Sequence, residues 1–375
     1  MKLGTAAATA AALGLAAVPL LTFRADAGPV AASKVAVFAD PDYTHPDEEV
    51  ANLIDDLVAG GHTTVTIDDT SADDFAAGLD GAQVLAFPEF AVAEEAWTAE
   101  DFVADLDGDA ADLIASFVDG GGRVLFFGSS DPTPAINDLF GFSVTHVEEF
   151  CGEAAEPLRE AGNDDVSAAA ADQTCPITPA AADTEFADGP AAVGYVSDAT
   201  GLAPGSLPAG STTAYSGVAT TPPLEYVAPS AAIALDAVVS MPYGDGAVVF
   251  LGWDWFPDSD EGGASVASVE DEADWATVLD LAVSQPTVTA AKSGTSVVLT
   301  SDSPSTQPVF VSLTLNGATQ TVIIAPKTTS ASVPLPAGTT SASFSVPGWG
   351  VGEGAVDVLG TSAPRPVVAN PRFTG

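Results

Sequence analysis

The sequence predicts an α/β domain with a flavodoxin-like, mostly parallel sheet and helices on both faces, followed by a small all-β sandwich. Three observations predict this. Short apolar runs alternate with helical spacing over residues 33–130, only strand patterns follow residue 286, and the charge changes abruptly between these parts. The length of 375 residues also suits two domains better than one.

The first part alternates strands with helices. The apolar run at 34–39 is typical of a strand buried on both faces. A helix is expected over 47–59, because its apolar residues have helical spacing and Gly60-Gly61 follows. The further elements are strands at 64–67, 83–87 and 123–127 and helices at 110–118 and 135–140. This order predicts right-handed crossovers and a parallel sheet.

The rest of the first domain is less regular. Residues 150–230 are rich in Ala, Pro, Thr and Asp and have weak strand signals. Strands at 231–241 and 247–253 are expected to form a hairpin around a Tyr-Gly-Asp-Gly turn. A helix at 274–283 closes the domain, whose expected bounds are 33–285.

The second part contains only strand patterns. The expected strands are 287–289, 296–299, 309–315, 320–324, 330–333 and 342–346, with polar turns between them. Their spacing predicts an antiparallel β-sandwich of immunoglobulin-like proportions over 286–362. The proline-containing residues 363–375 are expected to form an extended tail.

Residues 1–27 have the pattern of an export signal. Lys2 precedes an apolar run at 6–21, and Ala25-Asp26-Ala27 fits the cleavage rule. The run is shorter than the roughly 20 residues that span a bilayer, so we expect a secreted or cell-surface protein without a transmembrane segment in the mature chain. In that oxidising compartment the two cysteines, Cys151 and Cys175, are expected to form a disulfide.

The charge balance excludes two classes of partner. The chain has 52 acidic and 9 basic residues, a formal charge of −43, which argues against nucleic acid and against anionic lipid. Residues 28–285 hold 48 of the acidic residues and three basic ones, whereas residues 286–375 hold three acidic and four basic ones. The step predicts a domain boundary at residue 285. A solvated acidic surface and a high-salt habitat both stay open as explanations.

Four segments carry a family resemblance: residues 35–40, Gly60-Gly61-His62-Thr63, the run from Gly121 to Gly128 before a tight turn, and residues 244–252. With them the first domain resembles the class I glutamine amidotransferase-like fold, in its ThuA-like, non-amidotransferase branch. For enzymatic members the resemblance implies a cysteine on the tight turn and a downstream His and Glu.

The sequence departs from that catalytic pattern. The turn reads Gly128-Ser129-Ser130, and Phe256 stands where the resemblance implies the histidine. A serine nucleophile needs a base within hydrogen-bond reach, so we expect no glutamine hydrolysis. Ser129 and Ser130 are the catalytic candidates that remain.

Ligands of parallel α/β sheets bind at the carboxyl ends of the strands. Polar and aromatic residues follow several of the expected strand ends. The predicted ligand crevice consists of Asp40, Asp42, Tyr43, His45, Glu89, Ser129, Ser130, Asp131, Asp254, Trp255 and Asp258.

Metal sites are a second interpretation of the acidic loops. Asp258, Asp260 and Glu261 have the oxygen ligands that Ca²⁺ prefers, although carboxylates also cluster by chance in so acidic a domain. His45, near Asp42 and Asp47, could bind Zn²⁺ or be a hydrogen-bonded turn residue.

The two tryptophans at the end of the expected strand 247–253 have two interpretations. Trp253 and Trp255 could stack on sugar rings or pack against the last helix, which carries Trp275. We expect Trp253 in the core and leave Trp255 open.

Two functions follow from these patterns. The first is a secreted, non-catalytic binding or cell-surface protein on a degenerate amidotransferase-like scaffold, whose partner is a small molecule, a glycan or an envelope component. The alternative is an extracellular hydrolase that acts on a carbohydrate-type substrate through a serine or a carboxylate-bound metal. Calcium is the one cofactor candidate.

Overall fold

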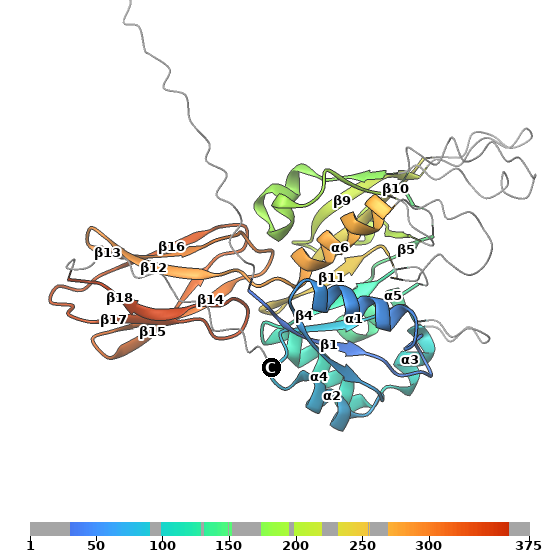
Figure 1. Ribbon diagram of the computed structural model, residues 1–375, viewed down its shortest axis with the longest axis horizontal. Helices are drawn as coiled ribbons and strands as arrows, with labels where there is room; N and C mark the ends of the chain where they lie inside the picture. Colours follow the sequence, from blue (N-terminus) through green and yellow to red (C-terminus); the bar gives the residue numbers. More distant parts are fainter. Residues whose placement is uncertain are drawn as a thin grey trace, which may run out of the picture.

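The computed structural model has an α/β domain followed by a β domain, as predicted (Figure 1). The structure describes residues 31–90, 99–128, 131–148, 150–151, 174–194, 199–219, 232–253, 255 and 269–359. The expected export signal (1–27) and tail (363–375) lie outside these residues. In the described part of the chain, no helix has the length and apolar content to cross a membrane.

The large sheet combines a parallel half and an antiparallel half. Its order is β2-β1-β3-β4-β11-β10-β8-β5, and β9 also pairs with β10. The parallel strands are β1 (Lys34–Phe38), β2 (Thr63–Ile67), β3 (Val84–Phe87), β4 (Arg123–Phe127) and β11 (Gly246–Leu251). The antiparallel pairs involve β5 (His146–Val147), β8 (Gly201–Leu202), β9 (Thr212–Ala219) and β10 (Ile233–Tyr243). The expected hairpin is confirmed, because β10 and β11 pair antiparallel through Tyr243 and Gly246.

Helices cover both faces of the sheet. They are α1 (Glu49–Ala59), α2 (Ala72–Leu79), α3 (Ala99–Asp105), α4 (Gly108–Asp119), α5 (Thr133–Phe140) and α6 (Val269–Val283). One core cluster contains Leu53 and Trp275, from α1 and α6. The other contains residues of α2 to α5, among them Phe75, Phe102 and Ile114. Each helix therefore buries one apolar stripe against the sheet.

The β domain consists of two antiparallel sheets. One has the order β12 (Val288–Ser293), β13 (Ser296–Ser301), β16 (Ser330–Pro334), and the other β15 (Ala318–Ile324), β14 (Val309–Leu315), β17 (Ala342–Ser345), β18 (Glu353–Val356). Alternate residues of β14 are buried, among them Val311 and Leu313, which share a core cluster with Val297 of β13. The strand β18 was not predicted, and the immunoglobulin-like assignment stays a prediction.

A buried arginine joins the two domains. Arg123, the first residue of β4, is 0% exposed and forms an ion pair of 2.8 Å with Glu185 of a 3-10 helix, η5 (Glu185–Asp188). Its guanidinium also donates to the Ala282 carbonyl (2.6 Å) and to Gln307 of the β domain (3.2 Å), and lies 4.1 Å from the centre of the Trp349 ring. Burial lowers the pKa of Arg123, and Glu185 opposes that shift.

Further hydrogen bonds surround this ion pair. The backbone N–H and hydroxyl of Thr306 both donate to the Glu185 carboxylate, at 2.8 Å each. Ser240 of β10 donates to the Thr306 hydroxyl, and Gln307 donates to the Gly121 carbonyl. Because Gly121 precedes β4, the β domain contacts the amino edge of the parallel strands.

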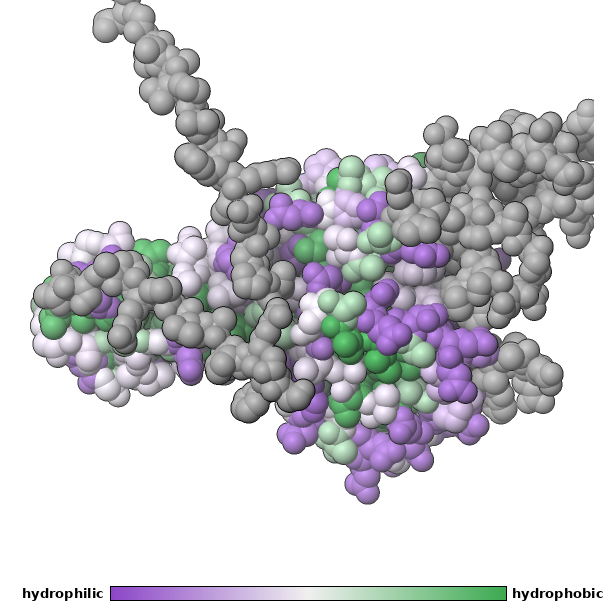
Figure 2. All heavy atoms as spheres, in the orientation of Figure 1, coloured by the Kyte–Doolittle hydropathy of each residue, from purple (hydrophilic) through white to green (hydrophobic). Residues whose placement is uncertain are grey.

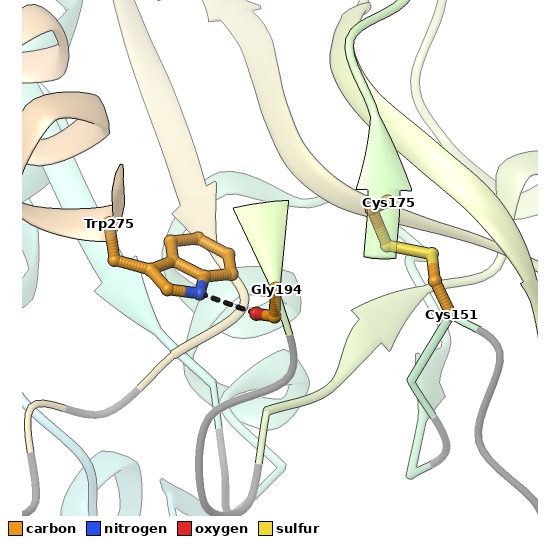
Figure 3. Close-up of a disulfide and its surroundings, with 4 residues drawn as sticks. All are labelled: Cys151, Cys175, Gly194 and Trp275. Atoms are coloured by element: carbon orange, nitrogen blue, oxygen red, sulfur yellow. Dashed lines mark hydrogen bonds between the residues drawn. A yellow bond between two sulfur atoms is a disulfide. The ribbon is translucent and has the colours of Figure 1, made fainter. Parts of the chain in front are cut away.

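The predicted disulfide is confirmed between Cys151 and Cys175, and both residues are buried (Figure 3). Gly217 of β9 packs against it, since a Cβ at this glycine would overlap the Cys151 sulfur. Near the disulfide, the Trp275 indole donates to the Gly194 carbonyl of β7 (Ala192–Gly194) at 3.0 Å. The disulfide thus fixes β6 (Thr174–Pro176) beside the antiparallel half of the sheet.

Removing the disulfide is expected to destabilise the protein. In the chain-entropy description, a loop with a sequence separation of 24 contributes about 3 kcal/mol, so the double variant Cys151→Ser, Cys175→Ser should lose about that much free energy of unfolding. Urea unfolding with and without reductant measures the difference. Equal stabilities of the oxidised and reduced wild-type protein would contradict a stabilising role.

Candidate functional site

The candidate site lies where the parallel strands end. The strand order of the sheet reverses direction at β1, because β2 pairs with one side of β1 and β3 pairs with the other. Such a switch point leaves a crevice at the carboxyl ends of the strands. The loops that follow β1, β3, β4 and β11 contain the residues predicted as the ligand crevice, and the structure describes part of them.

After β1, the chain turns around Asp40. Its carbonyl accepts from the backbone N–H groups of Tyr43 and Thr44, and its carboxylate accepts from the N–H of Asp42 at 2.9 Å. The side chain is 8% exposed. Burial raises the pKa of Asp40, the bond from Asp42 opposes this, and the charge of Asp42 adds to the rise. Asp40 is therefore a carboxyl group that holds its proton more tightly than an exposed aspartate.

Tyr43 occupies the core beneath this turn and does not line an open crevice. Its ring is 6% exposed and contacts Phe38 and Phe102, and its hydroxyl donates to Asp105 at 2.9 Å. Burial and the bond to Asp105 both raise the pKa of the Tyr43 hydroxyl. The ring thus fixes the β1 loop against α3.

A buried glutamate of the site was not predicted. Glu49, the first residue of α1, is 0% exposed, and its carboxylate accepts from the backbone N–H of Glu89 after β3 at 2.5 Å. It connects the β1 and β3 loops across the switch point. Its spacing of four from Leu53 and of eight from Leu57 places it on the buried stripe of α1. That spacing was the available signal, but the acidic run 47–49 has the composition of an exposed helix start.

Other predicted residues of these loops lie at helix starts. His45 is partly exposed, and its carbonyl accepts from the N–H groups of Glu48 and Val50 at the start of α1. Asp131 accepts from the N–H and the hydroxyl of Thr133 and so caps α5. Both residues thus take part in the local structure at a helix start.

Trp253 and Trp255 are both buried, at 5% and 2% exposure, with ring centres 4.3 Å apart. The expected core position of Trp253 is confirmed. Trp255 has φ of +66°, which is unusual for a bulky residue. Its indole donates to Asp56 of α1 at 2.8 Å, and its carbonyl accepts from Asn52 at 3.2 Å. These bonds, one helical turn apart on α1, hold the backbone in that conformation.

The turn after β4 is tightly packed. The N–H of Gly128 donates to the Leu251 carbonyl at 2.9 Å, and a Cβ at Gly128 would lie 2.6 Å from the Thr200 hydroxyl. Within the described residues, the Thr200 hydroxyl and the Trp253 indole N–H are buried without a hydrogen-bond partner. Gly128 and Gly252 both pack against Thr200. A larger residue at either position would displace the segment that contains Thr200.

Several predicted residues lie outside the described residues. They are Ser129, Ser130, Asp254, Phe256, Asp258, Asp260 and Glu261. The calcium site therefore stays a prediction, as do the serine nucleophiles. Within the residues that the structure describes, no three His, Cys, Asp or Glu side chains form a group that could hold a metal ion.

The carboxyl edge of the sheet is acidic. Among the described residues of the α/β domain, the basic side chains are Lys34 and Arg123, which begin β1 and β4 at the amino edge. His62 also lies at that edge, where its ring accepts from the N–H of Ser33 and contacts Asp280 at 3.0 Å. The carboxyl edge holds Asp40 and Glu49, so it favours neutral or cationic ligands over anions.

No protein-family model matches the sequence, and no curated protein matches it either. Among solved structures, the chain is similar to a putative ThuA-like protein from Bacteroides uniformis (9% identity, 68% of this chain and 91% of that chain, TM-score 0.37). It is similar to another putative ThuA-like protein, from Parabacteroides merdae (11% identity, 68% of this chain and 90% of that chain, TM-score 0.39). A third similar structure is that of an exo-β-1,4-mannosidase from an Opitutaceae bacterium (12% identity, 68% of this chain and 36% of that chain, TM-score 0.32). At these identities no ligand or activity is transferred to this chain.

The Trp255 contact is expected to stabilise the site. Asp56→Ala leaves a buried indole N–H without its acceptor, which should cost about 1–3 kcal/mol of free energy of unfolding. The neighbouring exposed residue provides the matched control, Asp55→Ala, which should be near neutral. Chemical unfolding monitored by tryptophan fluorescence measures both variants. Equal effects of the two substitutions would show that the indole bond contributes nothing.

Asp40 is expected to make stability depend on pH. Because its pKa is higher in the folded than in the unfolded state, it favours the fold below its ordinary pKa of 3.8, and this contribution is lost as pH rises through the folded value. Asp40→Asn should therefore be more stable than wild type at pH 7 and equally stable near pH 3, whereas exposed Asp47→Asn should show no such trend. Thermal unfolding across this range tests the sign. A stabilisation that persists at pH 3 would assign the effect to something other than the charge.

Proposed function

We propose that this chain is an exported, non-catalytic binding protein whose α/β domain holds a small neutral or cationic polar molecule at the carboxyl edge of its sheet. The acidic carboxyl edge of the sheet is the observation that carries this proposal. Asp40 and Glu49 are buried there, and the described basic groups of the domain lie at the opposite edge. Neutral sugars and amines suit such an acidic edge, since neither requires a basic side chain.

Two further observations support the proposal. Phe256 stands in the sequence where the amidotransferase resemblance implies a histidine, so the inherited reaction lacks its base. The Cys151–Cys175 disulfide suits an oxidising compartment, as does the export pattern at 1–27. Together they favour a protein outside the cytosol that has the amidotransferase-like fold without the amidotransferase reaction.

One observation favours a second candidate, an extracellular hydrolase of carbohydrate-type substrates. A general acid needs a carboxyl group whose pKa is raised toward the working pH, and burial raises the pKa of Asp40. Asp40 would then protonate the leaving oxygen of a glycosidic bond. We rank this candidate second, because a raised pKa also accompanies structural burial.

Thermal unfolding of the mature protein with a ligand panel tests the proposal. The panel consists of neutral sugars, primary amines and Ca²⁺, each also assayed for turnover, together with ammonia release from glutamine. A ligand at 100 times its dissociation constant should stabilise the fold by about 2.7 kcal/mol, without product. Glu49→Gln should reduce that stabilisation, and the exposed control Asp112→Asn on α4 should leave it unchanged.

Each other outcome has a defined meaning. Ammonia or cleaved glycoside would overturn the non-catalytic assignment, and the latter would favour the hydrolase. An unfolding midpoint that no member of the panel shifts would overturn the binding assignment.

A further inference from the structure

The strand β15 forms an unprotected edge of the β domain. It pairs with β14 over Ala318–Ile324, and among the described residues no strand pairs with its other side. Figure 1 shows it at the lower rim of the sandwich. Its sequence, ATQTVII, contains no charge and no proline, and Ile323 is 51% exposed. A flat, uncharged edge of this kind is a template for another strand.

Neighbouring edges carry the features that normally prevent strand pairing. β12 has Lys292, β16 ends in Pro334, and β18 has Glu353. The edge strand β2 of the large sheet is also uncharged, but it belongs to the acidic α/β domain and is followed directly by Asp68 and Asp69, whereas β15 is followed by Ala325, Pro326 and Lys327. Charged residues and proline within an edge strand discourage association, so β15 differs from β12, β16 and β18 in containing neither.

The charge distribution favours a second copy of the chain as the partner of this edge. Residues 28–285 carry 48 acidic and three basic residues, so two α/β domains repel each other strongly. Residues 286–375 are nearly neutral, with three acidic and four basic ones. On the face shown in Figure 2, the atoms of the sandwich are mostly pale or green, and the α/β domain has broader hydrophilic areas. Two copies can therefore approach most closely through the β domain.

We propose that this chain forms a homodimer in which β15 pairs antiparallel with β15 of a second copy around a two-fold axis. The two four-stranded sheets then become one sheet of eight strands. In a register centred on Thr321, that residue lies opposite its own copy and Thr319 lies opposite Ile323. Such a pairing places no like charges opposite each other, because the strand has none.

The proposed interface is compatible with the rest of the molecule. The β domain contacts the α/β domain through Thr306, Gln307 and Trp349, none of which belongs to β15. A single edge of seven residues is smaller than a standard interface, so the dimer is weak, with a dissociation constant of about 10 μM or more. Salt strengthens it, because salt screens the repulsion between the acidic domains.

Sedimentation equilibrium of the mature chain tests the proposal. Between about 1 μM and about 1 mM protein, the dimer fraction should rise with concentration, and at fixed protein concentration it should rise with NaCl from about 0.05 to about 1 M. At intermediate salt, Thr321→Lys places two lysines opposite each other and should weaken dimerisation about tenfold. Thr289→Lys makes the same change at an exposed site of β12 and should have no effect.

Three results would overturn the proposal. They are a chain that stays monomeric at every concentration and salt level, a dimer that weakens as salt rises, and equal effects of Thr321→Lys and Thr289→Lys. Each variant is first checked for a wild-type unfolding midpoint. If Thr321→Lys fails this check, Ile323→Lys replaces it, since Ile323 is exposed on the same strand.

Discussion

The buried Arg123 guanidinium is the constraint on which the arrangement of the two domains depends. A buried cation is costly unless it is paired and hydrogen-bonded. Arg123 obtains those partners from segments far apart in the chain: Glu185 from η5, Ala282 from the end of α6, and Gln307 and Trp349 from the β domain. Glu185 and Ala282 belong to the α/β domain, and the β domain completes the set with Gln307, with Trp349 and with Thr306, which donates to Glu185. Because the guanidinium and its counter-ion are fully hydrogen-bonded only when the domains are docked as observed, we infer that the domains behave as one folding unit.

This docking determines which surfaces of the protein stay available. The β domain occupies the amino edge of the parallel strands, beside Gly121 and Arg123. The carboxyl edge, with Asp40 and Glu49, is at the opposite end of the same strands, and β15 is at the rim of the sandwich. The proposed ligand site and the proposed dimer contact therefore do not compete for the same surface.

Local pattern predicted much of the fold and less of the site. The apolar strands, the hairpin and the disulfide were predicted because each is encoded in a short segment or a unique pair of cysteines. The helices Ala72–Leu79 and Ala99–Asp105 were missed, since their acidic first turns obscure a short apolar stripe. Glu49 and Arg123 were missed as buried charges, because burial of a charge depends on partners distant in sequence. Trp255 could not be assigned for the same reason, as its acceptors lie on α1.

Differential scanning calorimetry of Glu185→Ala tests the central claim most directly. The wild-type protein is expected to unfold in one cooperative transition. Removing the carboxylate leaves Arg123 buried without its counter-ion, so the variant should lose about 3–5 kcal/mol and unfold in two transitions, one for each domain. Asp188→Ala, an exposed change on the same 3-10 helix, should retain the wild-type profile. Two separate transitions in the wild-type protein, or a Glu185→Ala profile identical to it, would contradict the claim that the contacts of Arg123 and Glu185 with the β domain unite the domains.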